Sequence, residues 1–385
     1  MTTIDRGYLL DVLRRLIAIN SINPSLSPGA PGEAQIAGCL AELCRDLGLD
    51  VQIAEAAPGR PNVVATLRGE GRGRSLLLNG HVDTVSVEGM DRPFAPYERE
   101  GRVYGRGAYD MKGSLAAMLA ATAAIRAQHR LRGDLMLAFV ADEEYASLGT
   151  EALVRTARAD AAIVTEGTEL QIGIAHKGFA WVQFETAGVA AHGSRYDEGR
   201  DAIAAMGSVL VELRRLETMR LPQHRHPLLG RASVHASLIE GGEGLSTYPS
   251  RSVLRVERRT LPGEMAADIE AEMREVLQRA VGADAVAEGK VGVFFFRPAY
   301  EIEPHAPVVL ALSAAGQRVL GAPLRVIGLS PWMDSAILGT AGIPTVIFGP
   351  SGAGAHAAEE YVDVKSVVRC AQVLAQTAVQ FCGAR

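Results

Sequence analysis

The residues of this chain that are best suited to chemistry are histidines and carboxylates that follow apolar runs of strand length. The run 76–80 ends directly before His81 and Asp83. Alternate residues of a strand point to the same side, so this imidazole and this carboxylate should lie together. A carboxylate beside a histidine commonly orients a metal ligand, although a hydrogen-bonded pair in a loop has the same pattern.

Further polar residues follow other strand-like runs. The acids 142–144 are either a solvated loop or a cation site, and Glu166 follows the next apolar run. His356 lies in a glycine-rich loop after a further run, where a structural role is also compatible with the sequence. Asp110 ends a glycine-containing segment directly before an alanine-rich stretch. Taken alone, Asp110 is as compatible with a helix N-cap as with a site residue. A degenerate phosphate loop is disfavoured, because the glycine spacing fits neither common nucleotide pattern.

Together these residues favour a metal site. The carboxyl ends of strands in α/β sheets gather ligand sites. Imidazole and carboxylate without thiolate suit zinc, cobalt or manganese. One ion needs about four ligands, so five candidates fit two ions better, with one carboxylate bridging. A spare glutamate beside a ligand glutamate would be free to take a proton from water.

The elements that position these residues form two kinds of pattern. Strands and helices alternate up to residue 176 and again from residue 298, which predicts an α/β fold with a largely buried sheet. The predicted helices are 8–19, 33–47, 111–128, 150–156, 306–320 and 364–381, and the predicted strands are 51–54, 62–67, 75–79, 134–141, 161–165 and 344–348.

The order of predicted elements between these two parts is different. From 179 to 296 the order is strand, helix, strand, strand, helix, strand, which predicts a small antiparallel sheet with two helices on one face. We therefore expect a catalytic domain in two parts, residues 1–176 and 298–385, and an inserted domain at residues 177–297.

Composition limits the function classes. The 385 residues are 48% hydrophobic and carry a net charge of -5, so no basic field attracts nucleic acid or an anionic membrane. The longest apolar stretch, residues 114–125, is too short to span a bilayer. The four cysteines form no CxxC pair, so we expect buried, inert thiols and a cytoplasmic protein.

In combination, the motifs resemble the M20 family of metallopeptidases and deacylases, which includes acetylornithine deacetylases, succinyl-diaminopimelate desuccinylases and glutamate carboxypeptidases. The resemblance covers nearly the whole chain. The matching motifs are GHVDTV at 80–85, GRG at 105–107 with DMKG at 110–113, DEE at 142–144, and GAH at 354–356 with EEY at 359–361. It implies a zinc-peptidase-like catalytic domain with a mixed central sheet and an inserted α+β, ferredoxin-like lid and dimerisation domain.

The resemblance also implies the roles of the site residues. One metal would be bound by His81 and Glu166, and the other by Glu144 and His356. Asp110 would bridge the two metals and be followed by a cis peptide bond. In the same comparison, Asp83 would orient His81, and Glu143 would be the general base and later the acid for the leaving amine.

For the inserted domain, the resemblance implies a homodimer. His192 matches the histidine that reaches the partner subunit's site and stabilises the oxyanion, and Arg259 matches the arginine that binds the substrate carboxylate. Arginine suits that task because its fork binds a carboxylate through two hydrogen bonds. Its neighbour Arg258 is expected to be solvated or structural.

The function implied is a di-zinc amidohydrolase that cleaves the amide bond of N-acyl amino acids. A dipeptidase or glutamate-type carboxypeptidase with the same metals is the alternative, and a metal-free binding homologue or a nucleotide-binding enzyme fits the motifs less well. Departures from the family pattern at Tyr196 and near Ser246 weaken any assignment of the substrate. We expect specificity to depend on these loops and on residues 332–334.

Overall fold

The computed structural model of the chain describes residues 2–282 and 288–385. The chain divides into two compact units. The first comprises Met1–Ile174, Ile302–Ile327 and Met333–Arg385, and the second comprises Ala175–Glu301 and Gly328–Trp332. Segments that precede and follow the second unit in sequence therefore form the first unit together, so residues far apart in sequence lie in the same unit.

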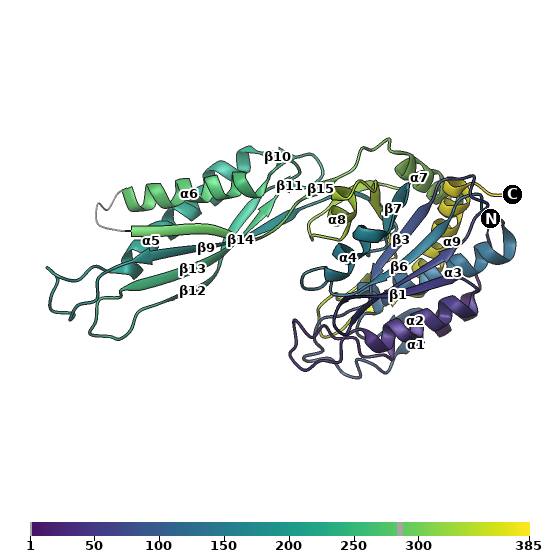
Figure 1. Ribbon diagram of the computed structural model, residues 1–385, viewed down its shortest axis with the longest axis horizontal. Helices are drawn as coiled ribbons and strands as arrows, with labels where there is room; N and C mark the ends of the chain where they lie inside the picture. Colours follow the sequence, from purple (N-terminus) through teal and green to yellow (C-terminus); the bar gives the residue numbers. More distant parts are fainter. Residues whose placement is uncertain (1, 283–287) are drawn as a thin grey trace. The chain divides into compact units, whose positions relative to one another are not determined.

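The largest sheet has nine strands in the order β1-β2-β6-β3-β7-β17-β8-β15, with β16 paired to β8 (Figure 1). Its strands are β1 Asp50–Ala57, β2 Arg60–Leu67, β3 Leu76–His81, β6 Leu135–Val140, β7 Ala161–Val164, β8 Ile172–His176, β15 Tyr300–Glu301, β16 Val326–Leu329 and β17 Thr345–Ile347. The four strands β6, β3, β7 and β17 are parallel to one another, whereas β1, β2 and β6 pair antiparallel. The parallel strands all end at the same edge, and this is where the polar motifs follow.

Seven α-helices belong to the first unit among its described residues. They are α1 Arg6–Ile17, α2 Ala34–Asp46, α3 Gly113–Gln128, α4 Leu148–Thr156, α7 Pro307–Leu320, α8 Ser335–Thr340 and α9 Val364–Cys382. The alanine-rich α3 is buried along most of its length and packs against α1 and α9. Every helix in the described part of the chain is too short or too polar to span a lipid bilayer. The predicted α/β class with a mixed central sheet is confirmed.

A small sheet in the first unit, which the sequence did not predict, joins two segments of the site. It has the order β18-β19-β5-β4, formed by Gly352–Ala353, Tyr361–Asp363, Arg102–Tyr104 and Tyr97–Arg99. Its strands are two or three residues long, which is too short for an alternating pattern to be recognised. Because β19 pairs with β5, the segment after His356 lies beside the segment before Asp110.

The second unit contains a four-stranded antiparallel sheet in the order β12-β13-β9-β14. Its main elements are β9 Gly178–Ala187, α5 Ala202–Arg215, β12 Ser233–Gly241, β13 Arg251–Thr260, α6 Ala266–Gly282 and β14 Glu288–Arg297. Short turns Leu216–Arg220 and Leu221–Gln223 and the hairpin of β10 Arg225–His226 with β11 Gly230–Arg231 follow α5. Alternate residues of β9, such as Ala180, Val182 and Phe184, are buried in one core with residues of α5 and α6. The predicted sheet with two helices on one face is present.

One helix boundary was predicted wrongly, and one buried strand was missed. The helix expected from residue 111 begins at Gly113, because Asp110 and Met111 have non-helical backbone angles within the irregular turn Ala108–Lys112. Strand β8 was not predicted at all. All five of its residues are buried, and a short apolar run of this kind has no periodicity to distinguish it.

Candidate metal centre

The edge at which the parallel strands end brings five of the predicted residues together within the first unit. His81 is the last residue of β3, Glu144 follows β6, and Glu166 follows β7. His356 follows β17 in the chain, and Asp110 lies in the irregular turn before α3. Each is therefore held by a strand end or by a turn attached to a buried helix.

Three of these residues form one group. The Nε2 atom of His81 lies 3.0 Å from Oδ1 of Asp110 and 3.4 Å from Oε1 of Glu166. One ligand atom from each of the three lies within 4.8 Å of those of the other two. The Nδ1 atom of His81 lies 3.0 Å from the main-chain oxygen of Asp83, which only accepts, so Nδ1 donates this bond. In the neutral imidazole, Nε2 then carries the lone pair that a cation needs.

A second group shares Asp110. The Nε2 atom of His356 lies 2.9 Å from Oε2 of Glu144 and 3.4 Å from Oδ2 of Asp110. These three ligand atoms also lie within 4.8 Å of one another. Asp110 thus presents one oxygen to each histidine, which is the arrangement required of a bridging carboxylate.

The backbone at Asp110 differs from that of a helix N-cap. The peptide bond between Asp110 and Met111 is cis, as the family resemblance implied. Helix α3 begins at Gly113, and its N-cap Lys112 makes no side-chain capping hydrogen bond. The carboxylate of Asp110 faces the two histidines instead, so the N-cap interpretation is wrong.

Without a cation, the acids of the two groups share protons. Burial and the nearby Asp110 carboxylate raise the pKa of Glu166 to about 8 and that of Glu144 to about 7. Hydrogen bonds to Asp110 and Glu144 raise the pKa of His356 to about 10. Burial acts to lower the pKa of His81, but hydrogen bonds to Asp110 and Asp83 outweigh it and raise that pKa well above its usual value. The carboxylates of the two groups therefore favour a positive charge beside them, which protons supply when no cation is bound.

The donor set fits divalent cations. Glu144 Oε1 is buried, and no atom of the described chain forms a hydrogen bond with it. A buried carboxylate oxygen without a partner costs free energy unless a proton or a cation neutralises it. Two imidazoles and three carboxylates, with no thiolate among them, suit zinc, cobalt or manganese.

Glu143 and Asp83 support this arrangement through the main chain. Oδ1 of Asp83 accepts the N–H of Glu143 at 3.1 Å, and Oδ2 accepts the N–H of Glu144 at 3.2 Å. Burial raises the pKa of the Glu143 carboxyl well above its ordinary value.

Sequence reasoning missed a buried polar network behind Asp83. Asn23 donates from Nδ2 to Asp83 Oδ2 at 2.7 Å and to Asp142 Oδ1 at 3.1 Å. Arg60 donates to Asn23 Oδ1 at 3.1 Å and to Asp142 Oδ1 at 2.8 Å. Glu33 accepts from Arg60 Nε at 2.6 Å. Asp142 is fully buried by these contacts, so acids 142–144 are not a solvated loop. An arginine before an otherwise apolar strand was the available signal.

Glu360 connects the two loops of the site. Oε1 accepts the N–H groups of Tyr109 and Asp110 at 2.9 and 3.0 Å. Oε2 accepts the N–H of Gly107 at 2.9 Å and Nη1 of Arg106 at 2.7 Å. These main-chain donors are the ones that a phosphate loop would offer to its ligand. Since a carboxylate of the chain already occupies them, the phosphate-loop interpretation is wrong.

The other predicted site residues belong to the second unit. His192 is exposed, with Nδ1 2.8 Å from Ser194 Oγ, and its loop pairs with Thr247 in the loop that contains Ser246. Arg259 is half-buried and donates to Glu257. Arg258, in contrast, is buried and forms ion pairs with Glu264 and Glu272, so it is structural.

Comparison with known proteins identifies the family of the chain. A model of peptidase family M20/M25/M40 matches residues 77–380. The chain is 30% identical over 410 residues to N-formyl-4-amino-5-aminomethyl-2-methylpyrimidine deformylase of Bacillus subtilis (strain 168), covering 97% of this chain and 94% of the relative. It is 32% identical over 341 residues to acetylornithine deacetylase of Myxococcus xanthus, covering 86% and 87%. A tripeptidase from Staphylococcus aureus subsp. aureus Mu50 has the same fold, with a TM-score of 0.81, 23% identity and 99% of each chain covered.

Proposed function

Because the chain belongs to peptidase family M20/M25/M40 and is a metal-dependent hydrolase of amide bonds, we propose that it is a two-metal deacylase of N-acyl amino acids. The observation that carries the proposal is the position of Asp110, whose two carboxylate oxygens each face a different histidine. The acetylornithine deacetylase relative supports deacylation of an amino acid.

In this proposal His81, Asp110 and Glu166 hold one divalent ion, and Asp110, Glu144 and His356 hold the other. Zinc is the proposed metal, with cobalt and manganese as alternatives. When bound, such ions supply a water of lowered pKa and positive charge for the oxygen of the scissile carbonyl. Asp83 keeps the tautomer of His81 that leaves Nε2 unprotonated.

Glu143 is the proposed general base. Its carboxylate takes a proton as water attacks the amide carbon, and passes that proton to the amide nitrogen when the carbon–nitrogen bond breaks. The main-chain bond to Asp83 holds Glu143 in place during both transfers. His192 of a partner subunit is proposed to stabilise the oxyanion, and Arg259 is proposed to bind the substrate carboxylate. The role of His192 requires a homodimer, which is proposed to form through the second unit.

The test combines metal analysis with a substrate panel. Purified protein should hold two divalent ions per chain and hydrolyse N-acetyl, N-succinyl or N-aroyl amino acids faster than dipeptides. Glu143→Gln should keep both ions and lose turnover by about a hundredfold or more, because proton transfer of this kind typically contributes that much. Retained turnover, or a protein that binds no metal, would contradict the proposal.

A second candidate is favoured by the deformylase relative, which covers 97% of this chain. That activity releases formate from an amine that bears a pyrimidine ring, as the relative's name states. The same panel should therefore include an N-formyl aminomethylpyrimidine. A dipeptidase or glutamate-type carboxypeptidase is the remaining alternative, and faster cleavage of dipeptides would favour it. Location in the cytoplasm stays a prediction.

A further inference from the structure

Four aromatic side chains gather on the face of the second unit's sheet that lies opposite α5 and α6. We call this cluster, which consists of Phe179, Trp181, Phe295 and Trp332, the aromatic platform. Phe179 and Trp181 alternate in β9 with residues buried under the helices, so they point to the other face. The centroid of the Phe179 ring lies 5.4, 5.7 and 6.3 Å from the ring centroids of Trp181, Phe295 and Trp332, respectively.

The platform is unusual for this chain. Aromatic residues make up 5% of the sequence, and the two tryptophans of the chain are both in the platform. All four rings are partly exposed, and Phe294 beside Trp181 is 55% exposed. Exposed apolar clusters of this kind commonly mark a binding site.

A charged residue at the platform indicates what kind of ligand it takes. The guanidinium of Arg259 lies 5.3 Å from the centroid of the Phe179 ring. Its Nε donates to Glu257 Oε1 at 2.7 Å, and Glu257 Oε2 accepts from Trp181 Nε1 at 3.2 Å. Glu257 thus fixes the arginine and the indole relative to each other. In the described chain the Arg259 side chain donates no other hydrogen bond, so its two terminal nitrogens can bind a carboxylate in the forked geometry.

We propose that the aromatic platform is a specificity subsite for a planar ring, and that the preferred substrates are N-acyl amino acids carrying an aromatic group. The inference rests on the proposed function, because Arg259 is assigned to the substrate carboxylate there. A ring attached to the same amino acid then stacks on Phe179 or Trp181, and ring–ring contacts add binding beyond the area they bury. The ring belongs either to the side chain or to the acyl group.

Binding is tested first without catalysis. Dansylglycine carries a planar naphthalene ring and a carboxylate, and its sulfonamide resists hydrolysis. Because both tryptophans lie in the platform, tryptophan emission should be quenched saturably by this probe in metal-depleted protein and in metal-loaded protein alike. Phe179→Leu should weaken binding about tenfold by removing a ring face. Dansylamide, which lacks the carboxylate, should bind more weakly than dansylglycine. Absence of saturable quenching would overturn the inference.

Kinetics then locates the ring. N-acetylphenylalanine and N-benzoylglycine carry it on opposite sides of the amide, and N-acetylcyclohexylalanine replaces the planar ring by a saturated one of similar size. We expect kcat/KM for one aromatic substrate to exceed that for the cyclohexyl substrate by about tenfold. In Phe179→Leu this ratio should fall to near one. A ratio near one in the parent enzyme would overturn the inference while leaving deacylation intact.

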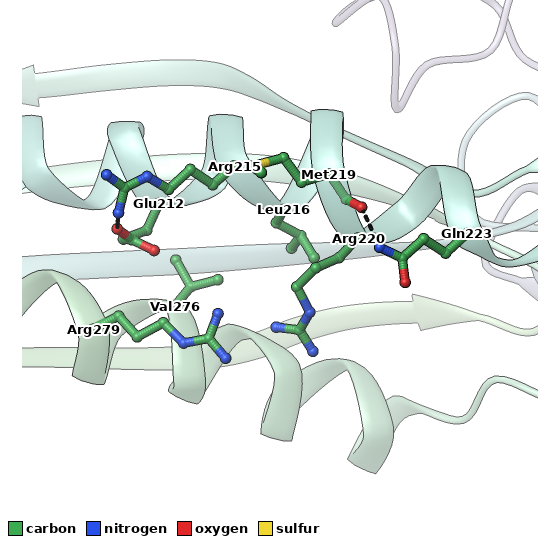
Figure 2. A pocket seen from close by; sticks show the side chains of 8 residues that line it. All are labelled: Glu212, Arg215, Leu216, Met219, Arg220, Gln223, Val276 and Arg279. Carbon is green, nitrogen blue, oxygen red and sulfur yellow. Dashed lines mark hydrogen bonds and ion pairs between the residues drawn. The ribbon is translucent and has the colours of Figure 1, made fainter.

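A matched control lies on the other side of the same unit. Met219 is 65% exposed and lines a pocket of about 410 Å³ with Arg215, Arg279 and other residues of α5, the following turns and α6 (Figure 2). Met219→Leu should change neither dansylglycine binding nor the kinetic ratio, and a change equal to that of Phe179→Leu would count against the platform. Conversely, dansylglycine binding without hydrolysis of any N-acyl amino acid would contradict the proposed function and leave the subsite standing.

Discussion

Asn23 donates a hydrogen bond to Asp83 over 2.7 Å, and Asp83 in turn accepts the main-chain N–H groups of Glu143 and Glu144. The amide of Asn23 is fully used, because Nδ2 also donates to Asp142 and Oδ1 accepts from Arg60 and the N–H of Ser25. A residue of a proline- and glycine-rich loop therefore helps to determine where the proposed base and one proposed metal ligand lie.

Asn23→Asp is the sharpest test of this relationship. The new side chain has the same shape but presents an oxygen where Nδ2 faced two carboxylates. We expect metal affinity and kcat to fall about tenfold to a hundredfold, as for other residues that hold metal ligands in place. Isothermal titration with zinc and steady-state kinetics measure the two effects separately.

Asn62 provides the matched control. It is also buried in the first unit, but Nδ2 donates to the main-chain oxygen of Gly149, and Oδ1 accepts the N–H of Ala141. Asn62→Asp should lower the free energy of unfolding without a comparable loss of metal affinity. Equal losses in both variants would mean that Asn23 acts only through stability.

The stability of metal-depleted protein should fall as pH rises. Glu144 and Glu166 keep protons in the folded state up to pKa values of about 7 and 8, whereas the unfolded chain releases them near 4.5. His356 acts in the same direction, with its pKa raised from 6.5 to about 10. The folded state binds more protons throughout this range, so its advantage is complete at low pH and is lost between about pH 4.5 and 10.

Thermal denaturation in the presence of a chelator checks this prediction across that pH range. Added zinc should raise the melting temperature more at high pH than at low pH, because the metal replaces the protons. Glu144→Gln combined with Glu166→Gln should flatten the profile. The measurements are made in about two hundred millimolar salt to limit surface effects. If the melting temperature of the metal-free protein rises from pH 5 to pH 8, other groups dominate the pH dependence of stability.

Mixing two inactive variants tests the proposed role of His192. His192→Ala should lose activity and keep its metal, since the residue lies in the second unit and outside both ligand groups. Refolding or incubating it with Glu143→Ala should restore part of the activity, because a hybrid dimer has one site with an intact Glu143 and an intact partner histidine. Mixtures that exchange subunits and stay inactive would argue against a shared site.

Alanine substitution of the neighbours Arg258 and Arg259 should affect different properties, the stability of the fold in the first case and substrate binding in the second. Arg258 is 1% exposed between Glu264 and Glu272, so Arg258→Ala should lower the free energy of unfolding by about 3 kcal/mol. Arg259→Ala should cost less than about 1 kcal/mol, because its ion pair with Glu257 is partly solvated, but should raise KM. Urea denaturation and kinetics distinguish the two, and a reversed order of stability would contradict the structural assignment of Arg258.

The sequence predicted four of the five candidate ligands because they follow strands, and it predicted Asp110 from the family motif. Apolar runs such as 76–80 and 135–141 are visible without coordinates, and parallel strands bring their ends together whatever the details of packing. The turn at Asp110 could not be predicted in the same way. Its conformation depends on Glu360, which lies 250 residues further along the chain.

The polar support of the site was missed for a physical reason. Asn23 and Arg60 belong to a loop and a strand start, where local sequence does not reveal whether a polar side chain faces water or another buried group. Here each is buried because its partners are carboxylates far along the chain. Only the tertiary fold supplies those partners, so no periodicity or spacing could have identified them.

The insertion of the second unit between the two parts of the first has a consequence for biosynthesis. His81, Asp110, Glu144 and Glu166 are all translated before the inserted residues, whereas His356 is translated after them. A nascent chain therefore carries the candidate ligands His81, Asp110 and Glu166 well before the ribosome has added His356. Loading of the two proposed cation positions is expected to be sequential during synthesis, with the His356 position completed last.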